Sequence, residues 1–195
     1  MVWAAIAFII VASWAGWRLS RASRLPRPGE CAPDFVLPDQ HGVRRALGEF
    51  RGRWLALYFY PRDDTPGCTR QALCFRDAAG VLEQRGVVVC GVSVDDPASH
   101  AAFARKHALP FVLLADRAGI VAARYGSLLD LGFVKLARRN TFLVDPQGVI
   151  ASVRRGASPA TSAEDLIQDL AAACARAAAQ AKPLESPPSS SGDVS

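Results

Sequence analysis

The stretch YFYPRDDTPGCTRQALCFRD, residues 58–77, decides the fold, because a strand, a polar loop and a helix follow one another within it. Its first residues end a continuous apolar and aromatic run, residues 53–60, which is typical of a strand buried on both faces. Pro61 cannot donate to a sheet ladder and therefore ends the strand. The loop then leads into a predicted helix whose first turn contains Cys68 and whose pattern extends over residues 69–84.

The rest of the chain alternates predicted strands and helices. Apolar runs predict further strands at residues 87–94, 111–114, 141–144 and 149–153. Helical patterns predict further helices at residues 97–107, 118–125 and 162–181. The last two strands are expected to pair, because the turn sequence Asp-Pro-Gln-Gly joins them. This alternation predicts a layered α/β domain.

Two of the predicted helices carry start signals. Asp96 is expected to cap the helix over residues 97–107, with Pro97 at its first position. The sequence Ser-Ala-Glu-Asp at residues 162–165 has the pattern of a capping box, which predicts Ser162 as the N-cap of the last helix.

The amino-terminal segment is apolar. Residues 1–17, MVWAAIAFIIVASWAGW, contain no charged side chain, and as a helix they span roughly 25 Å of the ~30 Å hydrocarbon core. Because Arg18 and Leu19 extend the span, we predict a membrane anchor over residues 1–19. The nearby positive charge follows the apolar run, which favours an outside amino terminus and a cytoplasmic location for the chain that follows. Export after signal cleavage is the alternative, although a signal peptide normally has Lys or Arg before the apolar run.

Three further segments complete the predicted organisation. Residues 20–30 form a Pro- and Arg-rich linker, residues 31–181 form the domain, and residues 182–195 form a polar tail without a hydrophobic pattern, predicted to be disordered. Part of the net charge of +5 lies in the arginines of residues 18–27. We therefore interpret the basic balance as a flank of the membrane segment and not as a nucleic-acid-binding face.

Cys68 is well placed for nucleophilic chemistry. Only the thiolate is a good nucleophile, and a free thiol ordinarily titrates near pH ~8.5. The amino terminus of a helix presents unpaired N–H groups and the positive end of the helix dipole, both of which favour the anion. Gly67 lets the backbone approach the reacting atoms closely, and Thr65 brings a hydroxyl to the same pocket.

The segment resembles the active-site motif of peroxiredoxins, Pro-x-x-x-Thr-x-x-Cys, at Pro61, Thr65 and Cys68. The longer match FYPRDDTPGCT is similar to the peroxiredoxin Q group, also called bacterioferritin comigratory proteins. The resemblance covers residues 29–170 and includes GECAPDFVLPDQHG, VVVCGVSVDDP, FVLLAD, ARYG and RRNTFLVDPQG. It implies a thioredoxin-like fold, a central mixed sheet flanked by helices, preceded here by one N-terminal apolar helix.

The resemblance also implies roles for the residues of the motif. Cys68 corresponds to the peroxidatic cysteine, which attacks the peroxide O–O bond and becomes a sulfenic acid. Thr65 corresponds to the residue whose hydroxyl holds both thiolate and peroxide, and Pro61 to the residue that shields the thiolate from water. The backbone N–H groups of Gly67 and Cys68 are expected to be further donors to the substrate.

An arginine completes the implied site. Arg139, in the stretch RRNTFLVDPQG, corresponds to the arginine that lies over the thiolate. A guanidinium in that position favours the thiolate and stabilises charge on the leaving oxygen. The neighbouring Arg138 is the alternative for this role.

The position of a second, resolving cysteine departs from the group. Many members have it five residues after the peroxidatic cysteine, where this chain has Leu73, and Cys74 comes one residue later. Six helical residues span roughly 9 Å, beyond the about 4.4–6.8 Å that a disulfide allows between Cα atoms, so the helix must unwind before Cys74 bonds to Cys68. Resolution by Cys74 and direct reduction by an external thiol are therefore two alternatives.

The other cysteines are interpreted as chemically inert. Cys90 lies in an apolar strand, Cys174 lies among alanines, and Cys31 is expected to be exposed. The sequence has no CxxC pair and no Cys/His spacing typical of zinc.

Several other polar residues are interpreted as structural. His41, His100 and His107 are scattered and are expected on the surface or in loops. Asp63 and Asp64 are expected in a solvated turn and not in a metal or acid–base pair. The sequence therefore predicts no metal site.

The leading hypothesis is a thiol-dependent peroxidase that reduces hydrogen peroxide and organic hydroperoxides, with thioredoxin or a similar thiol as reductant, acting as a monomer or a dimer. The resemblance implies no metal, flavin or haem, because the electrons come from thiols. A second hypothesis is a membrane-anchored thiol–disulfide oxidoreductase, which the lack of a CxxC pair disfavours. A third is a catalytically silent binding module, which the complete set of motif residues disfavours.

Overall fold

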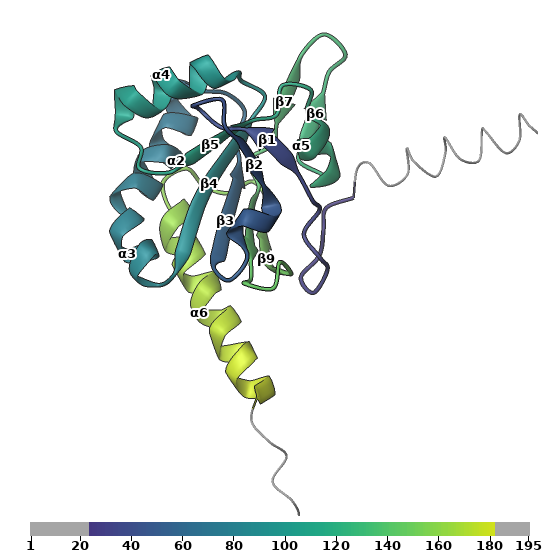
Figure 1. Ribbon diagram of the computed structural model, residues 1–195, viewed down its shortest axis with the longest axis vertical. Helices are drawn as coiled ribbons and strands as arrows, with labels where there is room; N and C mark the ends of the chain where they lie inside the picture. The colour runs from purple at the N-terminus through teal and green to yellow at the C-terminus, as the bar shows by residue number, and fades with distance from the viewer. Residues whose placement is uncertain (1–23, 182–195) are drawn as a thin grey trace, which may run out of the picture.

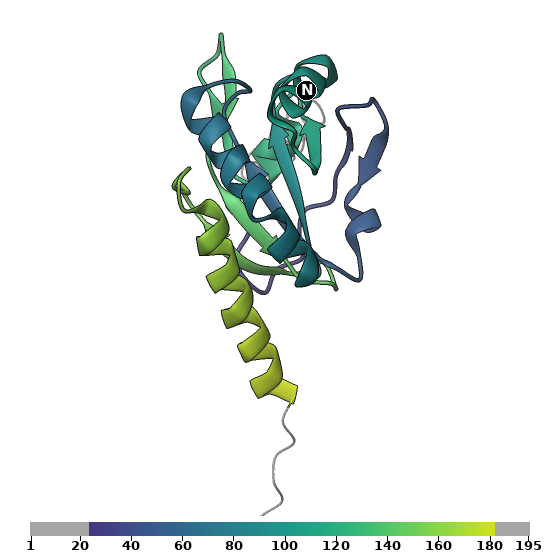
Figure 2. The ribbon, with the colours of Figure 1, turned by 90° about the vertical axis from the view of Figure 1, so that its left-hand side faces the viewer.

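The computed structural model describes residues 24–181, which form a five-stranded sheet between two covering layers (Figure 1, Figure 2). The strand order is β5 (Val112–Ala115), β4 (Val87–Ser93), β3 (Trp54–Phe59), β8 (Thr141–Val144) and β9 (Ile150–Arg154). β3, β4 and β5 are parallel, whereas β8 is antiparallel to β3 and β9 is antiparallel to β8. This mixed sheet with flanking helices confirms the predicted thioredoxin-like α/β architecture.

The central strand β3 supplies both cores of the domain, because successive side chains of a strand point to opposite faces. Leu55, Leu57 and Phe59 belong to one core cluster, and Ala56 and Tyr58 belong to the other. None of these five residues is more than 1% exposed. A strand that fills two cores must be apolar at every position, which explains why the run lacks alternation.

Four helices cover one face of the sheet (Figure 2). They are α2 (Pro66–Asp77), α3 (Ala79–Gln84), α4 (Pro97–His107) and α6 (Ser162–Ala181). Each helix places an apolar side chain in the core cluster on this face: Phe75, Leu82, Phe103 and Leu166, respectively. α6 packs beside α2, so the carboxyl-terminal helix contacts the helix that begins next to Cys68.

The opposite face is covered by shorter elements. They are the antiparallel pair β1 (Val36–Pro38) and β2 (Arg44–Ala46), the 3-10 turn η1 (Leu47–Phe50) and α5 (Ile120–Arg124). α5 matches the predicted helix over residues 118–125 in place, although it is shorter. These elements shield the second core cluster, to which η1 and α5 contribute buried side chains.

Two hairpins were not predicted from the sequence. The first is β1–β2, and the second is formed by β6 (Leu128–Asp130) and β7 (Lys135–Ala137), which Figure 1 shows extending beside α5. Each strand has only three residues, which is too short for an alternating pattern to stand out from a loop. β6–β7 precedes β8 and so delivers the chain to Arg139.

The predicted helix over residues 69–84 is divided into α2 and α3. α2 begins earlier than predicted, at Pro66, and the two helices meet at Ala78, which has φ −91° and ψ −2°. The N–H of Ala78 still donates to the carbonyl oxygen of Cys74 at 3.2 Å. The local signal for the break is weak: proline is absent, and Gly80, two residues after Ala78, is a glycine that a helix can tolerate.

The two start signals have different outcomes. The Asp96 side chain accepts a hydrogen bond from the Ser99 N–H at 2.9 Å, which confirms it as the N-cap of α4. Ser162 is instead the first helical residue of α6, and its hydroxyl donates to the Ser158 carbonyl oxygen. The predicted capping box at Ser162 is therefore wrong.

A part-buried ion pair joins α6 to the edge strand β9. Arg154, at the end of β9, donates from Nε to Asp169 Oδ2 at 2.7 Å and from Nη2 to Asp169 Oδ1 at 2.8 Å. Its Nη1 also lies 3.1 Å from an oxygen of Asp165. The paired geometry matches the planar guanidinium to the carboxylate and so fixes the orientation of the helix.

The prediction of a membrane-anchored protein is corrected. Within residues 24–181 no helix is both long and apolar enough to cross a membrane. The segment predicted to do so, residues 1–19, and the tail predicted over residues 182–195 lie outside the described part of the chain. The described part of the predicted linker contacts the sheet, since the Gly29 N–H donates to the Ile150 carbonyl oxygen at 2.8 Å.

We expect Gly91→Ala, in β4, to destabilise the protein by about 1–3 kcal/mol through overpacking. A Cβ at this position would lie 2.8 Å from atoms of Leu113 and Tyr58, both of which are buried. Gly80→Ala is the matched control, because a Cβ there meets no atom within 4 Å and alanine favours the helix by roughly 0.5–1 kcal/mol. Urea unfolding measures both, and equal free energies of unfolding for the two variants would contradict the packing argument.

Candidate active site

Cys68 lies in the first turn of α2, at the carboxyl end of β3. Thr65 occupies the N-cap position with extended φ and ψ of −81° and 146°, and Pro66 is the first helical residue. The hydrogen-bonded ladder begins with the Thr69 N–H, which donates to the Thr65 carbonyl oxygen at 2.9 Å. The N–H groups of Gly67 and Cys68 precede that ladder, as the first amides of a helix do. The Cys68 residue is 1% exposed.

Arg139 contacts the sulfur directly. Its Nη2 lies 3.4 Å from Cys68 Sγ, and its Nη1 donates to Gln71 Oε1 at 2.6 Å. The neighbouring Arg138 is exposed, and its backbone N–H donates to the Ser127 carbonyl oxygen. The structure therefore brings Arg139, and not Arg138, to Cys68.

Gln71 is a site residue that the sequence reasoning missed. It is fully buried on α2, one helical turn after Cys68, and its Nε2 donates to Ser162 Oγ at 3.0 Å. Ser162 in turn donates to the Ser158 carbonyl oxygen. This chain of hydrogen bonds ties the guanidinium of Arg139 to the start of α6. A polar residue at a position of α2 that faces the core was the available signal.

Gly67 leaves room for the guanidinium. A Cβ at this position would lie 3.1 Å from Nη2 of Arg139, which is closer than an ordinary van der Waals contact. Any larger residue would therefore push Arg139 away from the sulfur or shift the start of α2.

Thr65 and Pro61 flank the same turn. The Thr65 hydroxyl donates to the Arg62 carbonyl oxygen at 3.1 Å, which leaves its oxygen free to accept a hydrogen bond. Pro61 is half-buried and directly follows Tyr60, whose N–H is bonded to the Val92 carbonyl oxygen. The β3–α2 loop thus carries both residues to the start of α2, whose first turn contains Cys68.

The loop between β3 and α2 corrects two predictions. Asp63 was expected in a solvated turn, but its side chain is 4% exposed and its Oδ2 lies 2.9 Å from His100 Nδ1. His100 was expected on the surface, but it is fully buried. Burial by itself would raise the pKa of Asp63. The hydrogen bond and charge of His100, together with hydrogen bonds from Ser99 and Tyr60, instead lower the pKa of Asp63 below its ordinary value.

The burial of His100 had a weak sequence signal. It lies three residues before Phe103 on α4, and residues three apart share one face of a helix. The partner of His100 gave no signal, because Asp63 is 37 residues away in the chain. The other two histidines differ: His41 is exposed as predicted, and His107 is part-buried, with its Nε2 3.2 Å from Asp64 Oδ1.

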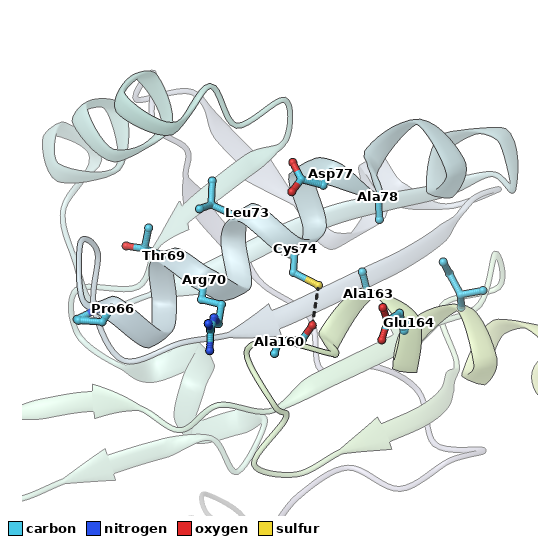
Figure 3. Close-up of a pocket in the computed structure, with 11 residues that line it drawn as sticks. Pro66, Thr69, Arg70, Leu73, Cys74, Asp77, Ala78, Ala160, Ala163 and Glu164 are labelled. Atoms are coloured by element: carbon cyan, nitrogen blue, oxygen red, sulfur yellow. Dashed lines mark hydrogen bonds between the residues drawn. The ribbon is translucent and has the colours of Figure 1, made fainter.

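Cys74 lies in a groove between α2 and the start of α6 (Figure 3). The groove has a volume of about 730 Å³ and includes Leu73, Ile167, Arg70 and Glu164 among its lining residues. Cys74 is half-buried, and its thiol donates to the Ala160 carbonyl oxygen at 3.6 Å, the contact drawn as a dashed line in Figure 3. The sulfur of Cys74 thus borders a groove, whereas Cys68 is enclosed.

The remaining cysteines occupy different environments. Cys31 and Cys174 are exposed, and Cys90 is fully buried in β4. Burial raises the pKa of the Cys90 thiol far above its ordinary value, so this sulfur stays protonated. Among residues 24–181, no group of three or more His, Cys, Asp or Glu side chains has the arrangement of a metal site.

Comparison with known proteins gives matches over the same region. The model of the AhpC/TSA family matches residues 28–153. The chain is 43% identical over 129 residues to the putative peroxiredoxin bcp of Coxiella burnetii, covering 64% of this chain and 85% of that protein. It is 44% identical over 122 residues to the chloroplastic peroxiredoxin Q of Populus jackii, covering 63% of this chain and 57% of that protein.

Solved structures agree with the sequence matches. Peroxidoxin BcpB from Mycobacterium tuberculosis has a TM-score of 0.72 and 32% sequence identity, covering 75% of this chain and 97% of that chain. The chain spans little more than half of the length of the plant relatives that it matches.

We expect Arg139→Gln to slow alkylation of Cys68 by iodoacetamide near pH 7 about tenfold, because it removes the charged hydrogen bond to the reacting sulfur, a contact worth roughly 1.4 kcal/mol. Arg138→Gln is the matched control, with the same change of charge one residue away and no contact with the sulfur. Mass spectrometry of the Cys68 peptide gives both rates. Equal slowing in the two variants would mean that the net positive charge near Cys68, and not the contact of Arg139 with the sulfur, controls the reactivity of Cys68.

Proposed function

Since this chain belongs to the AhpC/TSA family, within the peroxiredoxin Q or bacterioferritin comigratory protein group, we propose that it is a thiol-dependent peroxidase with Cys68 as its nucleophile. The observation that carries the proposal is the 3.4 Å contact between Arg139 Nη2 and Cys68 Sγ at the start of a helix. Hydrogen peroxide and organic hydroperoxides are the proposed substrates, and residues 31–181 the catalytic unit.

In the proposed first step, the Cys68 thiolate attacks one oxygen of the peroxide. The S–O bond forms as the O–O bond breaks, the sulfur becomes a sulfenic acid, and the leaving oxygen takes a proton to give water or an alcohol. Negative charge moves from the sulfur to the leaving oxygen in this step. Arg139 stabilises it at both ends, because the guanidinium is held beside the sulfur by Gln71 before the peroxide arrives.

The other residues of the motif position the substrate in this mechanism. The amides of Gly67 and Cys68 donate to the peroxide, because they precede the hydrogen-bonded ladder of α2. Thr65 accepts from the O–H of the peroxide, since its own proton is donated to the Arg62 carbonyl oxygen. Pro61 excludes water from the sulfur, because its ring has no N–H that would attract solvent.

We propose that Cys74 resolves the sulfenic acid. Its thiolate attacks the sulfur of Cys68, the S–OH bond breaks with release of water, and a disulfide forms. The turn of α2 between the two cysteines must unwind first, because six helical residues span roughly 9 Å. The Cys74 thiol is held by a weak hydrogen bond to the Ala160 carbonyl oxygen, so moving this side chain out of its place costs little.

A dithiol reductant such as thioredoxin would then return the enzyme to its starting state. One of its thiolates attacks Cys74, and the resulting mixed disulfide is resolved by its second thiol, so that the disulfide is transferred to the reductant. The groove between α2 and α6 supports this step, since it leads from the surface to the Cys74 sulfur (Figure 3).

Two other functions have less support. A thiol–disulfide oxidoreductase exchanges a dithiol through a CxxC pair, which the sequence lacks. A silent binding module would not need a part-buried guanidinium contact to a cysteine at a helix start. The contacts of Cys68 and Arg139 therefore favour the peroxidase over both.

We expect Cys68→Ser to abolish peroxide turnover, because an alcohol is far less nucleophilic than a thiolate. Consumption of hydrogen peroxide in the presence of thioredoxin and its reductase measures turnover. Cys90→Ser is the matched control, since Cys90 is buried in the core cluster that does not contain Cys68 and is expected to keep the parent rate. Turnover by Cys68→Ser at the parent rate would refute the proposed nucleophile.

Cys74→Ser tests the resolving step separately. We expect the variant to react with one equivalent of peroxide at the parent rate but to accumulate sulfenic acid at Cys68 instead of a disulfide. Intact-mass measurement distinguishes a gain of one oxygen from a loss of two hydrogens. If thioredoxin supports equal steady-state turnover in parent and variant, Cys68 is reduced directly and the role of Cys74 is wrong.

A further inference from the structure

His100 is a fully buried histidine that the proposed mechanism does not use. It lies on α4, and its ring contacts three groups from other parts of the chain, of which the Tyr60 hydroxyl is the most distant, at 3.4 Å from Nδ1. Nδ1 is 2.9 Å from Asp63 Oδ2, and Nε2 is 3.2 Å from the Leu114 carbonyl oxygen. The ring therefore joins the β3–α2 loop, α4 and β5 in the interior of the protein.

The partners of the ring indicate which of its two nitrogens donate hydrogen bonds. A carbonyl oxygen only accepts, so Nε2 of His100 carries a proton toward Leu114. Asp63 accepts the hydroxyl protons of Tyr60 at 2.8 Å and of Ser99 at 2.7 Å, which is the pattern of an ionised carboxylate. Nδ1 must then donate to it as well. His100 and Asp63 therefore form a buried hydrogen-bonded pair in which Nδ1 is the donor.

Asp63 is the anchor of the loop that precedes Cys68. Its side chain accepts three hydrogen bonds, and its N–H donates to Asp95 Oδ2 at 2.9 Å, just beyond β4. The next residue, Asp64, has φ +54°, an unfavourable conformation for a residue other than glycine. The pair therefore holds the loop in a strained path that ends at the N-cap residue Thr65.

We propose that His100 is a positioning residue for Cys68: by holding Asp63 it sets where α2 begins, and so aligns the sulfur with Arg139. The proposal rests on the proposed role of Cys68 as the nucleophile. Without a donor at the position of Nδ1, the buried Asp63 carboxylate loses one of its three hydrogen bonds and turns toward solvent to recover hydration. Such a turn moves Thr65 and the first amides of α2 with it.

The test compares two substitutions that each keep one of the two ring donors. In His100→Asn the amide nitrogen takes the place of Nδ1 and still donates to Asp63. In His100→Gln the amide nitrogen takes the place of Nε2 and donates to Leu114 instead. Both replace the ring by an uncharged amide of similar size, so a merely structural role would affect the two alike. Two rates are measured on Cys68, its oxidation by hydrogen peroxide and its alkylation by iodoacetamide, together with urea unfolding.

We expect both rates of His100→Gln to fall about tenfold, as for the loss of one charged hydrogen bond, and those of His100→Asn to stay within about twofold of the parent. His107→Gln is the matched control on the same helix and is expected to keep the parent rates, because His107 bonds the exposed Asp64 and not Asp63. Equal rates in the Asn and Gln variants, after correction for the unfolded fraction, would overturn the proposal.

A second variant covers loss of folding in His100→Gln. Ser99→Ala removes one of the three donors to Asp63 and keeps the contact between His100 and Asp63. We expect a smaller fall in both rates, about threefold. Parent rates in Ser99→Ala, with His100→Gln unfolded, would also overturn the proposal. If the parent protein is alkylated at Cys68 but does not react with peroxide, the peroxidase function is refuted. The alkylation rates of the variants would still test whether His100 positions Cys68.

Discussion

The contact between the Arg139 guanidinium and the Cys68 sulfur, at 3.4 Å, is the interaction on which the proposed chemistry depends. Burial of a thiol disfavours its anion, so a buried nucleophile needs a fixed positive charge and helix-start amides beside it. The guanidinium is fixed because Gln71 accepts from its other nitrogen and is in turn bonded to Ser162. Gly67 contributes by having no side chain where the guanidinium lies.

The sheet makes that contact possible by its topology. β3 delivers the chain to Cys68 at its carboxyl end, and β8 pairs with it in the antiparallel direction, so residues just before β8 meet the loop just after β3. Arg139 and Cys68 are therefore neighbours although 71 residues separate them. α6 is held over the same face by the pair of Arg154 with Asp169, which brings Ser162 within reach of Gln71.

Two buried polar networks meet at the start of α2. One runs from Arg139 through Gln71 to Ser162 and controls the charge beside the sulfur. The other joins His100 to Asp63 and controls the path of the loop. Buried polar groups cost free energy unless all of them are bonded, so each network is stable only when the whole domain is folded. The position of the Cys68 sulfur therefore depends on both networks being intact.

Local pattern alone determined a large part of this protein. The order of strands and helices around residues 58–77 and the place of Cys68 at a helix start follow from apolar periodicity, proline and cap signals, which act over a few residues. The choice of the motif residues came from the resemblance to peroxiredoxins. Only the tertiary structure decided that Asp63 and His100 are buried together, that Gln71 holds Arg139, and that α2 and α3 separate at Ala78. Those contacts join residues 37 and 68 positions apart, and partners at such distances leave no mark on local periodicity.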